Sequence, residues 1–246
     1  MAKLGIIPAR YASTRFPGKP LADIGGKNMI QRVYEQASNA GSLDKVVIAT
    51  DDERIINEII RFGGEYVLTR PDHQSGTDRC AEVADKLPGY DVIINIQGDE
   101  PYIDPLQIDL LSSCFADPSV KLATLIKKIY SNEELFNHNI PKVVINAAEQ
   151  AIYFSRHPIP YIRNIDESNW ITTHQFYKHI GIYGYTRAAL LEITALPSSS
   201  LEHAESLEQL RWIENGYQIQ TKTTELETIA VDTPDDLEKI IRLKGI

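Results

Sequence analysis

Three cations gather in one short loop near the start of the chain. Arg10, Arg15 and Lys19 stand between residues 8 and 20, among hydroxyl side chains and directly after an apolar run. Guanidinium and ammonium groups, together with free backbone N–H groups, bind the oxygens of a polyphosphate. The loop is not a Walker A motif, because Lys19 is followed by proline instead of serine or threonine. The segment indicates a polyphosphate site, and a solvated loop with scattered charges stays open as the alternative.

Two acidic side chains follow apolar runs in distant parts of the chain. Asp99 comes after the run 92–96, and Asp232 comes after the run 229–231. If these runs are neighbouring strands, both carboxylates reach one edge of a sheet, where they could hold Mg²⁺ against phosphate oxygens. Each also has a structural interpretation, because Asp99 can open a turn and Asp232 can cap the helix expected from residue 234.

A third polar segment, residues 70–79, offers hydroxyl and amide donors beside Gly76. It follows the predicted strand 66–68, so we expect it at the same sheet edge. The alternative is a simple helix entry, in which Thr77 or Asp78 caps the helix that follows.

Short apolar runs alternate with helical patterns through the first half of the chain. Apolar runs that predict strands occupy residues 4–7, 46–49, 66–68 and 92–96, and the last of these is typical of a buried central strand. Apolar residues recur at helical spacing within 30–37, 55–60 and 80–87. The alternation predicts an α/β fold with a mainly parallel central sheet and helices on both faces.

The second half is less regular. Strands are predicted at 122–129, 143–145, 152–154, 180–185, 218–223 and 229–231. Helices are predicted at 187–194, at 203–214 and from residue 234. The polar and aromatic stretch 157–178 carries two prolines and is predicted to be an insertion from the sheet.

The composition excludes several classes of protein. A length of 246 residues suits one domain, 1–246, and the net charge of −9 argues against a nucleic-acid backbone as the main partner. Cys80 and Cys114 form no CxxC motif, which argues against a disulfide framework or a cysteine zinc site. No run approaches the ~20 apolar residues that cross a bilayer. We therefore expect a cytoplasmic protein without a membrane partner.

Seven segments, in order along the chain, resemble those of the cytidylyltransferases that activate acidic sugars. They are residues 7–21, 73–79, 97–101, 153–156, 178–185, 201–211 and 231–234. The resemblance spans nearly the whole chain and is strongest to the members whose sugar is 3-deoxy-manno-octulosonate (KDO). The related sialic-acid enzymes share the Pro-Ala-Arg start of the first loop but lack the Arg-Tyr-Ala-Ser-Thr-Arg run at 10–15. The resemblance implies a nucleotide-diphospho-sugar transferase-like fold with an inserted dimerisation subdomain.

The same resemblance implies a reaction, in which CTP and KDO give CMP-KDO and pyrophosphate with Mg²⁺, so that KDO is activated for lipopolysaccharide synthesis. The anomeric hydroxyl attacks the α-phosphorus, and positioning and charge neutralisation do most of the catalysis. Arg10 and Lys19 would hold the triphosphate with help from Arg15, while Asp99 and Asp232 would ligate Mg²⁺. The residues expected to contact cytidine are Ala9, Ser75, Gly76, Arg79 and Gln97.

The sugar acid is expected on the second half of the chain. The fork of Arg156 would bind its carboxylate. The side chains expected to bind its hydroxyls are His179, Tyr183, Glu205, Glu208 and Gln209. Positions 205, 208 and 209 would share one face of the predicted helix 203–214. As alternatives, Tyr183 is a core aromatic and the two glutamates form a solvated helix face.

A homodimer is also implied by the resemblance, with the insertion 157–178 in the contact. Tyr161, Trp170, Phe176 and Tyr177 are aromatics that suit an interface, and a lid or a surface hairpin is the alternative. Two other functions stay open. One is a cytidylyltransferase for another acidic sugar, such as 8-amino-KDO or sialic acid, and the other is a nucleotide-binding regulator without turnover.

Overall fold

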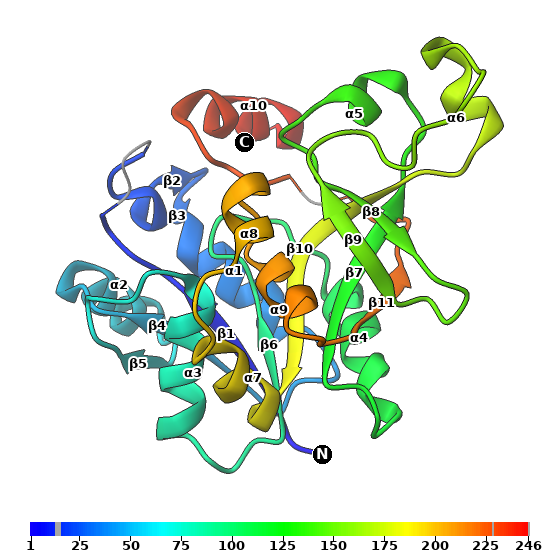
Figure 1. The fold of residues 1–246 in the computed structure, drawn as a ribbon. Coiled ribbons are helices and arrows are strands. Elements are labelled where there is room, and N and C mark those ends of the chain that lie inside the picture. Colours follow the sequence, from blue (N-terminus) through cyan, green and yellow to red (C-terminus); the bar gives the residue numbers. More distant parts are fainter. Residues whose placement is uncertain (13–15, 228, 246) are drawn as a thin grey trace.

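The computed structural model describes residues 1–12, 16–227 and 229–245. The strands of its main sheet are β1 (Lys3–Pro8), β4 (Lys45–Thr50), β5 (Tyr66–Leu68), β6 (Val92–Asn95), β7 (Leu122–Lys128), β10 (Tyr177–Thr186) and β11 (Ile219–Thr223). They lie in the order β11-β7-β10-β6-β1-β4-β5 (Figure 1). Neighbours are parallel, except that β10 runs antiparallel to β6 and β7. The predicted α/β fold with a mainly parallel sheet is confirmed.

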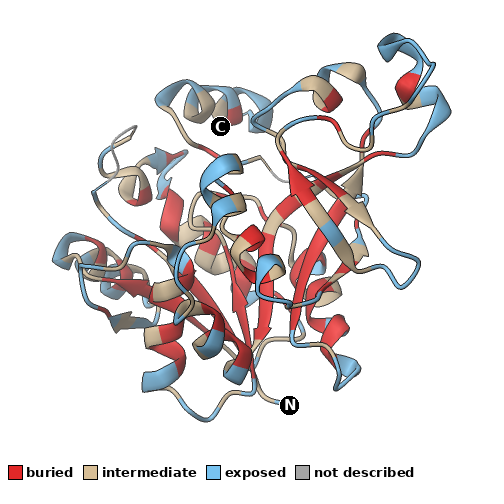
Figure 2. Cartoon of the chain, in the orientation of Figure 1, coloured by how far each residue is buried: buried red, intermediate tan, exposed pale blue. Residues whose placement is uncertain are grey.

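Helices cover both faces of this sheet. One face packs against α1 (Met29–Ser38), α2 (Glu53–Phe62) and α4 (Pro105–Ser112), and the other packs against α3 (Gly76–Lys86), α7 (Arg187–Thr194) and α9 (Gln209–Glu214). The central strands between these layers are almost wholly buried, whereas the edge strand β5 and the outer sides of the helices are exposed (Figure 2). Parallel strands that are buried on both faces explain the continuous apolar runs in the sequence.

Smaller elements complete the chain. They are β2 (Asp23–Ile24), β3 (Lys27–Asn28), β8 (Lys142–Ile145), β9 (Ala151–Ser155), α5 (Asn132–Phe136), α6 (Trp170–Thr173), α8 (Ser200–Glu205), α10 (Pro234–Lys244) and the 3₁₀ turns η1 (Lys19–Leu21), η2 (Ser113–Ala116) and η3 (Glu167–Asn169). Strand β8 pairs with both β9 and β10, so these strands extend the sheet beyond its main path. Among the described residues, no helix has the length and apolar character needed to cross a membrane.

Two helix starts differ from the predicted capping. Ser75 caps α3 and forms a reciprocal capping box with Asp78, so neither Thr77 nor Asp78 is the cap. Thr233 caps α10, so the start of this helix does not require the carboxylate of Asp232. Both corrections have the same cause, because a cap accepts a backbone N–H two or three residues ahead and therefore stands just before the first helical residue.

Two predicted elements are wrong. Residues 203–214 do not form one helix, because Ser206 adopts a left-handed conformation (φ 51°) that ends α8, and α9 begins at Gln209. Residues 229–231 form no strand in the described structure. Their approach to the sheet rests on one backbone hydrogen bond, from the N–H of Val231 to the carbonyl of Asp99 at 2.9 Å.

The predicted insertion forms an arm with its own small core. Tyr177 and Lys178 begin strand β10, so the arm ends before residue 177. Trp170 and Phe176 are each 1% exposed and pack with Ile129 and Leu135. These two aromatics are therefore core residues of this chain, and the prediction that they supply interface surface is wrong.

Candidate active site

A cavity of about 340 Å³ opens at the carboxyl ends of β1 and β6. Its lining brings together four segments that are far apart in the sequence: the first loop, the loop and helix start at 73–79, the turn after β6, and Asp232 before α10. The predicted nucleotide and metal residues among its lining are Ala9, Arg10, Lys19, Ser75, Gly76, Arg79, Gln97, Asp99 and Asp232. Arg15 lies outside the described residues. The other lining residues are Pro8, Pro20, His73, Gln74 and Gly98.

The two acids predicted to share a cation lie on either side of one ammonium group. Lys19 Nζ is 2.7 Å from Asp99 Oδ2 and 3.3 Å from Asp232 Oδ1. A cation is thus held between carboxylates that are 133 residues apart in sequence. Among the described residues, no cluster of three or more His, Cys, Asp or Glu side chains suited to a metal ion is found. The donor set fits a hard divalent ion that takes its remaining oxygens from phosphate and water.

Backbone packing brings the two acids together. Val231 is fully buried with Ile24, Met29 and Ile240, and its N–H donates to the carbonyl of Asp99. The chain after β11 is therefore held beside the end of β6, although no strand forms there. The next residue along is Asp232, whose side chain reaches the same ammonium group as Asp99.

Glu100 modifies the charge at this edge. Burial, together with the charge of Asp99, raises the pKa of Glu100 to about 8. Glu100 is consequently protonated near neutral pH, so it adds little negative charge to the site.

Gly98 allows two strand ends to approach each other. A Cβ atom at this position would lie 2.7 Å from the carbonyl oxygen of Pro8, which is backbone and cannot move aside cheaply. The first loop and the turn after β6 therefore share one cavity because residue 98 has no side chain.

The loop before α3 is held by buried contacts. Arg79 is 4% exposed, and its Nη1 lies 2.9 Å from Asp51 Oδ1 and donates to Thr69. His73, in the same loop, pairs with Glu82. Arg79 and His73 line the cavity, but both side chains are also bonded to the scaffold, which fixes the cavity wall.

Two predicted sugar residues present buried polar atoms without partners. Among the described residues, the hydroxyl of Tyr183 and the Nε2 of Gln209 are buried and have no hydrogen-bond partner. Buried donors are normally satisfied, so this pair indicates a place where a polar ligand or water completes the contacts. The ring of Tyr183 also packs edge-on to Trp212 at 5.1 Å, so Tyr183 has a core role as well.

His179 is the third predicted sugar residue on this side. Its Nε2 is 3.0 Å from Thr124 Oγ1, and its ring packs against Phe154 and Tyr183. Burial lowers the pKa of His179 to about 3, so the imidazole is neutral at physiological pH. Strand β10 is irregular just beyond His179, and there the carbonyl of Gly181 accepts a hydrogen bond from Gln97 Nε2 at 2.9 Å. This bond connects β10 to the cavity.

The remaining predicted sugar residues are already engaged with the protein. The carboxylate of Glu205 accepts from the Ser155 hydroxyl at 2.7 Å and from the Arg156 N–H at 2.8 Å. The Arg156 guanidinium donates to the carbonyls of His138, Glu205 and Ser206. Because the predicted helix 203–214 is broken, 205, 208 and 209 do not share one helical face.

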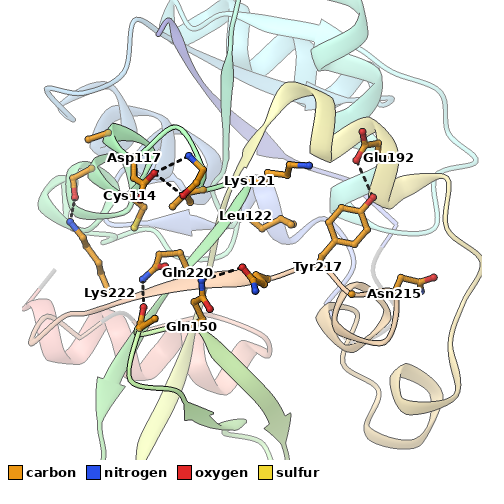
Figure 3. A pocket seen from close by; sticks show the side chains of 17 residues that line it. Cys114, Asp117, Lys121, Leu122, Gln150, Glu192, Asn215, Tyr217, Gln220 and Lys222 are labelled. Atoms are coloured by element: carbon orange, nitrogen blue, oxygen red, sulfur yellow. Dashed lines mark hydrogen bonds between the residues drawn. The ribbon is translucent and has the colours of Figure 1, made fainter.

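A larger cavity of about 860 Å³ lies at the amino ends of β7 and β11, away from these groups. Its polar side chains are largely paired with one another (Figure 3). Lys222 Nζ donates to Ser113 Oγ at 2.6 Å, and the Tyr217 hydroxyl donates to Glu192 at 3.0 Å. It holds neither a cationic loop nor the two acids that share a cation, so the smaller cavity is the candidate active site.

Some cavity residues could not be predicted from the sequence. His73 and Gln74 lie inside the segment 70–79 that was singled out, but no spacing showed which side chains face the ligand. Pro8 and Pro20 flank the cationic loop and contribute walls instead of charge.

Comparison with known proteins gives a consistent result over the full length. The family model described as "Cytidylyltransferase" matches residues 4–243. Two curated relatives are named 3-deoxy-manno-octulosonate cytidylyltransferase. The one from Parabacteroides distasonis is 58% identical over 98% of this chain and 97% of its own length, and the one from Bacteroides thetaiotaomicron is 57% identical over 97% and 96%.

Solved structures agree with the sequence matches. A structure of CMP:2-keto-3-deoxy-manno-octonic acid synthetase complexed with CTP has a TM-score of 0.93 and 44% identity, and the match covers 100% of this chain and 99% of that one. A cytidylyltransferase from Leptospira borgpetersenii is 16% identical with a TM-score of 0.64, covering 98% and 85%, and it shares the fold alone.

Proposed function

The chain belongs to the cytidylyltransferase family, and we propose that it transfers CMP from CTP to the anomeric hydroxyl of KDO, with release of pyrophosphate. The observation that carries the proposal is the cavity in which a cationic loop faces two carboxylates that share one cation. The relatives named for this reaction match nearly the whole chain. The product, CMP-KDO, is the activated sugar for lipopolysaccharide synthesis.

The cationic loop is proposed to bind the triphosphate. Arg10 and Lys19 line the cavity at the end of β1, and Arg15 follows in the same loop. Charge-assisted hydrogen bonds from these side chains would hold the phosphates in line with the attacking hydroxyl. Positive charge placed there before the reaction also stabilises the charge that develops on the leaving pyrophosphate.

Asp99 and Asp232 are proposed to hold Mg²⁺. The support is that the pair already holds a cation, the Lys19 ammonium, between oxygens of the kind that Mg²⁺ prefers. A bound Mg²⁺ would neutralise charge on the phosphates of CTP. In that state Lys19 would turn from the two acids to the phosphates, and Asp99 and Asp232 would keep their places through the backbone contact of Val231.

The cytidine is proposed to lie against Ala9, Gln97 and the loop before α3. Ser75 and Gly76 offer backbone and hydroxyl groups at the start of α3, and Arg79 forms part of the wall. The N-terminal end of a helix also favours the negative charge of the nucleotide.

The sugar acid is proposed to lie between β10, the end of β9 and α9. Tyr183 and Gln209 supply polar atoms that have no partner among the described residues, and neutral His179 packs against Tyr183. Glu205 and Glu208 are proposed to line this site from the α8–α9 side, where they would accept hydrogen bonds from sugar hydroxyls. A guanidinium has five N–H donors, and the three that Arg156 directs at carbonyls leave two for the sugar carboxylate.

Two further features of the proposal concern assembly and compartment. The arm at 157–176 is proposed to contribute to a homodimer through its exposed side chains, since Tyr161 is 72% exposed. The cytoplasm is the proposed compartment, because the thiols of Cys80 and Cys114 are free and buried, as in proteins of reducing compartments.

The function is tested by pyrophosphate release from CTP with a panel of acidic sugars. The proposal expects turnover with KDO to exceed that with 8-amino-KDO and sialic acid, and Asp99→Asn to lower it by several orders of magnitude without unfolding the protein. Higher turnover with 8-amino-KDO or sialic acid would assign the protein to the corresponding reaction instead. Tight CTP binding without turnover on any sugar would make it a nucleotide-binding regulator.

A further inference from the structure

Thr77 connects the nucleotide side of the site to the α8–α9 corner, which we define as residues 205–209. Thr77 is 3% exposed in the first turn of α3, and its hydroxyl donates to Glu208 Oε2 at 2.7 Å. The Ser75 side chain, which lines the nucleotide cavity, also lies on the side of Glu208 and favours its ionised form. The carboxylate of Glu208 is therefore held by the Thr77 hydroxyl at the start of α3.

The opposite end of the α8–α9 corner is fixed to β9. Glu205 accepts hydrogen bonds from the Ser155 hydroxyl and the Arg156 backbone N–H, and Arg156 donates back to the Glu205 carbonyl. Between these attachments, Ser206 holds the left-handed conformation that turns the chain. The α8–α9 corner thus extends from the start of α3 to the end of β9, which Arg156 follows directly.

We infer that Thr77 is a positioning residue for sugar binding, which holds the carboxylate of Glu208 correctly placed at the sugar site. The inference rests on the proposed function, in which Glu208 accepts hydrogen bonds from sugar hydroxyls. Thr77 itself touches neither substrate in this account. It acts through Glu208, to which its hydroxyl donates.

The chemistry of the surroundings explains why Glu208 needs these donors. Burial raises the pKa of Glu208, whereas the Thr77 and Ser75 hydroxyls oppose that rise because they favour the ionised form. The other titratable groups that face Glu208 are Asp78 and Cys80 on α3, Tyr183 and Tyr185 on β10, and Arg211 on its own helix. Arg211 forms an ion pair with Glu202, so its charge is largely compensated.

The test compares Thr77→Val, which removes the hydroxyl at nearly constant shape, with Thr77→Ser, which keeps it. At saturating CTP and Mg²⁺, Thr77→Val is expected to raise the KM for KDO roughly tenfold, the usual size of a hydrogen bond to a charged group. The KM for CTP should change by less than about threefold on the same scale, and Thr77→Ser should restore the KM for KDO. A carboxylate that has lost a donor takes up a proton at higher pH. The KM for KDO should rise as the pH is lowered, and in Thr77→Val this rise should begin at a higher pH than in the wild-type protein.

Glu208→Ala and the double variant distinguish this inference from the function on which it rests. In the Glu208→Ala background no acceptor is left for the Thr77 hydroxyl, so if Thr77 acts through Glu208, Thr77→Val has no further effect on the KM for KDO there. Additive effects, a wild-type KM and pH profile in Thr77→Val, or equal rises in both KM values without rescue by Thr77→Ser would each overturn the inference. Absence of turnover with KDO in the unaltered protein would instead overturn the proposed function.

Discussion

His179 is expected to make the folded protein sensitive to acid. Its imidazole packs against Phe154 and Tyr183 and lies beside Thr124, and burial lowers its pKa to about 3. In the unfolded chain the pKa of histidine is about 6.5. Between these values the unfolded chain binds a proton that the folded protein does not bind, so stability falls as pH falls below 6.5 and rises as pH rises through that window.

The size of the effect follows from the pKa difference. At pH 5 the unfolded chain is about 1.5 pH units below the histidine pKa, and each unit is worth about 1.4 kcal/mol. His179 should therefore cost roughly 2 kcal/mol of unfolding free energy at pH 5 relative to pH 7. His179→Gln removes this titration and keeps an amide N–H that can reach the Thr124 hydroxyl.

The assay is urea unfolding at pH 7 and pH 5, followed by circular dichroism. The unfolding free energy of the wild-type protein should fall by about 2 kcal/mol more than that of His179→Gln over this interval. Glu100, with a pKa of about 8, contributes in the opposite direction, but it is common to both proteins and cancels in the comparison. His174→Gln is the matched control, because His174 is exposed and should follow the wild-type protein. Parallel pH dependences of the wild-type protein and His179→Gln would refute the reasoning.

Two more substitutions test the scaffold of the site. In Gly98→Ala the new Cβ would clash with the Pro8 carbonyl oxygen, so the KM for CTP should rise at least about tenfold. Gly89→Ala is the control, because no atom lies within 4 Å of its added Cβ. Equal kinetics for the two variants would contradict the clash. Trp170→Ala should lower the unfolding free energy by about 3 kcal/mol or more, because the ring is buried and its Nε1 donates to the Ile165 carbonyl. A loss below about 1 kcal/mol in urea titration would contradict the assignment of Trp170 to the core of the arm.

The elements that form the sheet could be predicted because burial dictates their sequence. Residues 92–96 read as a continuous apolar run, and Val92–Asn95 is indeed a strand buried on both faces. Helix α4 was missed because Leu106 is 64% exposed while the polar Gln107 is buried, which blurs the helical pattern. The broken helix at 203–214 was missed because Ser206, and not a glycine, takes the left-handed conformation.

Some residues of the candidate site could likewise be predicted from the sequence, and others could not. The nucleotide residues follow strand ends, and the topology of a parallel sheet alone brings such positions together. The sugar residues depend on tertiary contacts that no spacing reveals, as when Glu205 accepts hydrogen bonds from Ser155 and Arg156. The sequence predicts only a helix-entry role for Thr77, because its partner Glu208 lies 131 residues away.

The account depends most on one cation shared by Asp99 and Asp232. Its most direct test is the anomalous difference map of a crystal soaked with CTP and Mn²⁺, collected at the manganese edge. We predict a peak within bonding distance of one oxygen from each carboxylate, with Lys19 turned to the phosphates. A peak that contacts only the phosphates, or lies away from Asp232, would contradict the central claim.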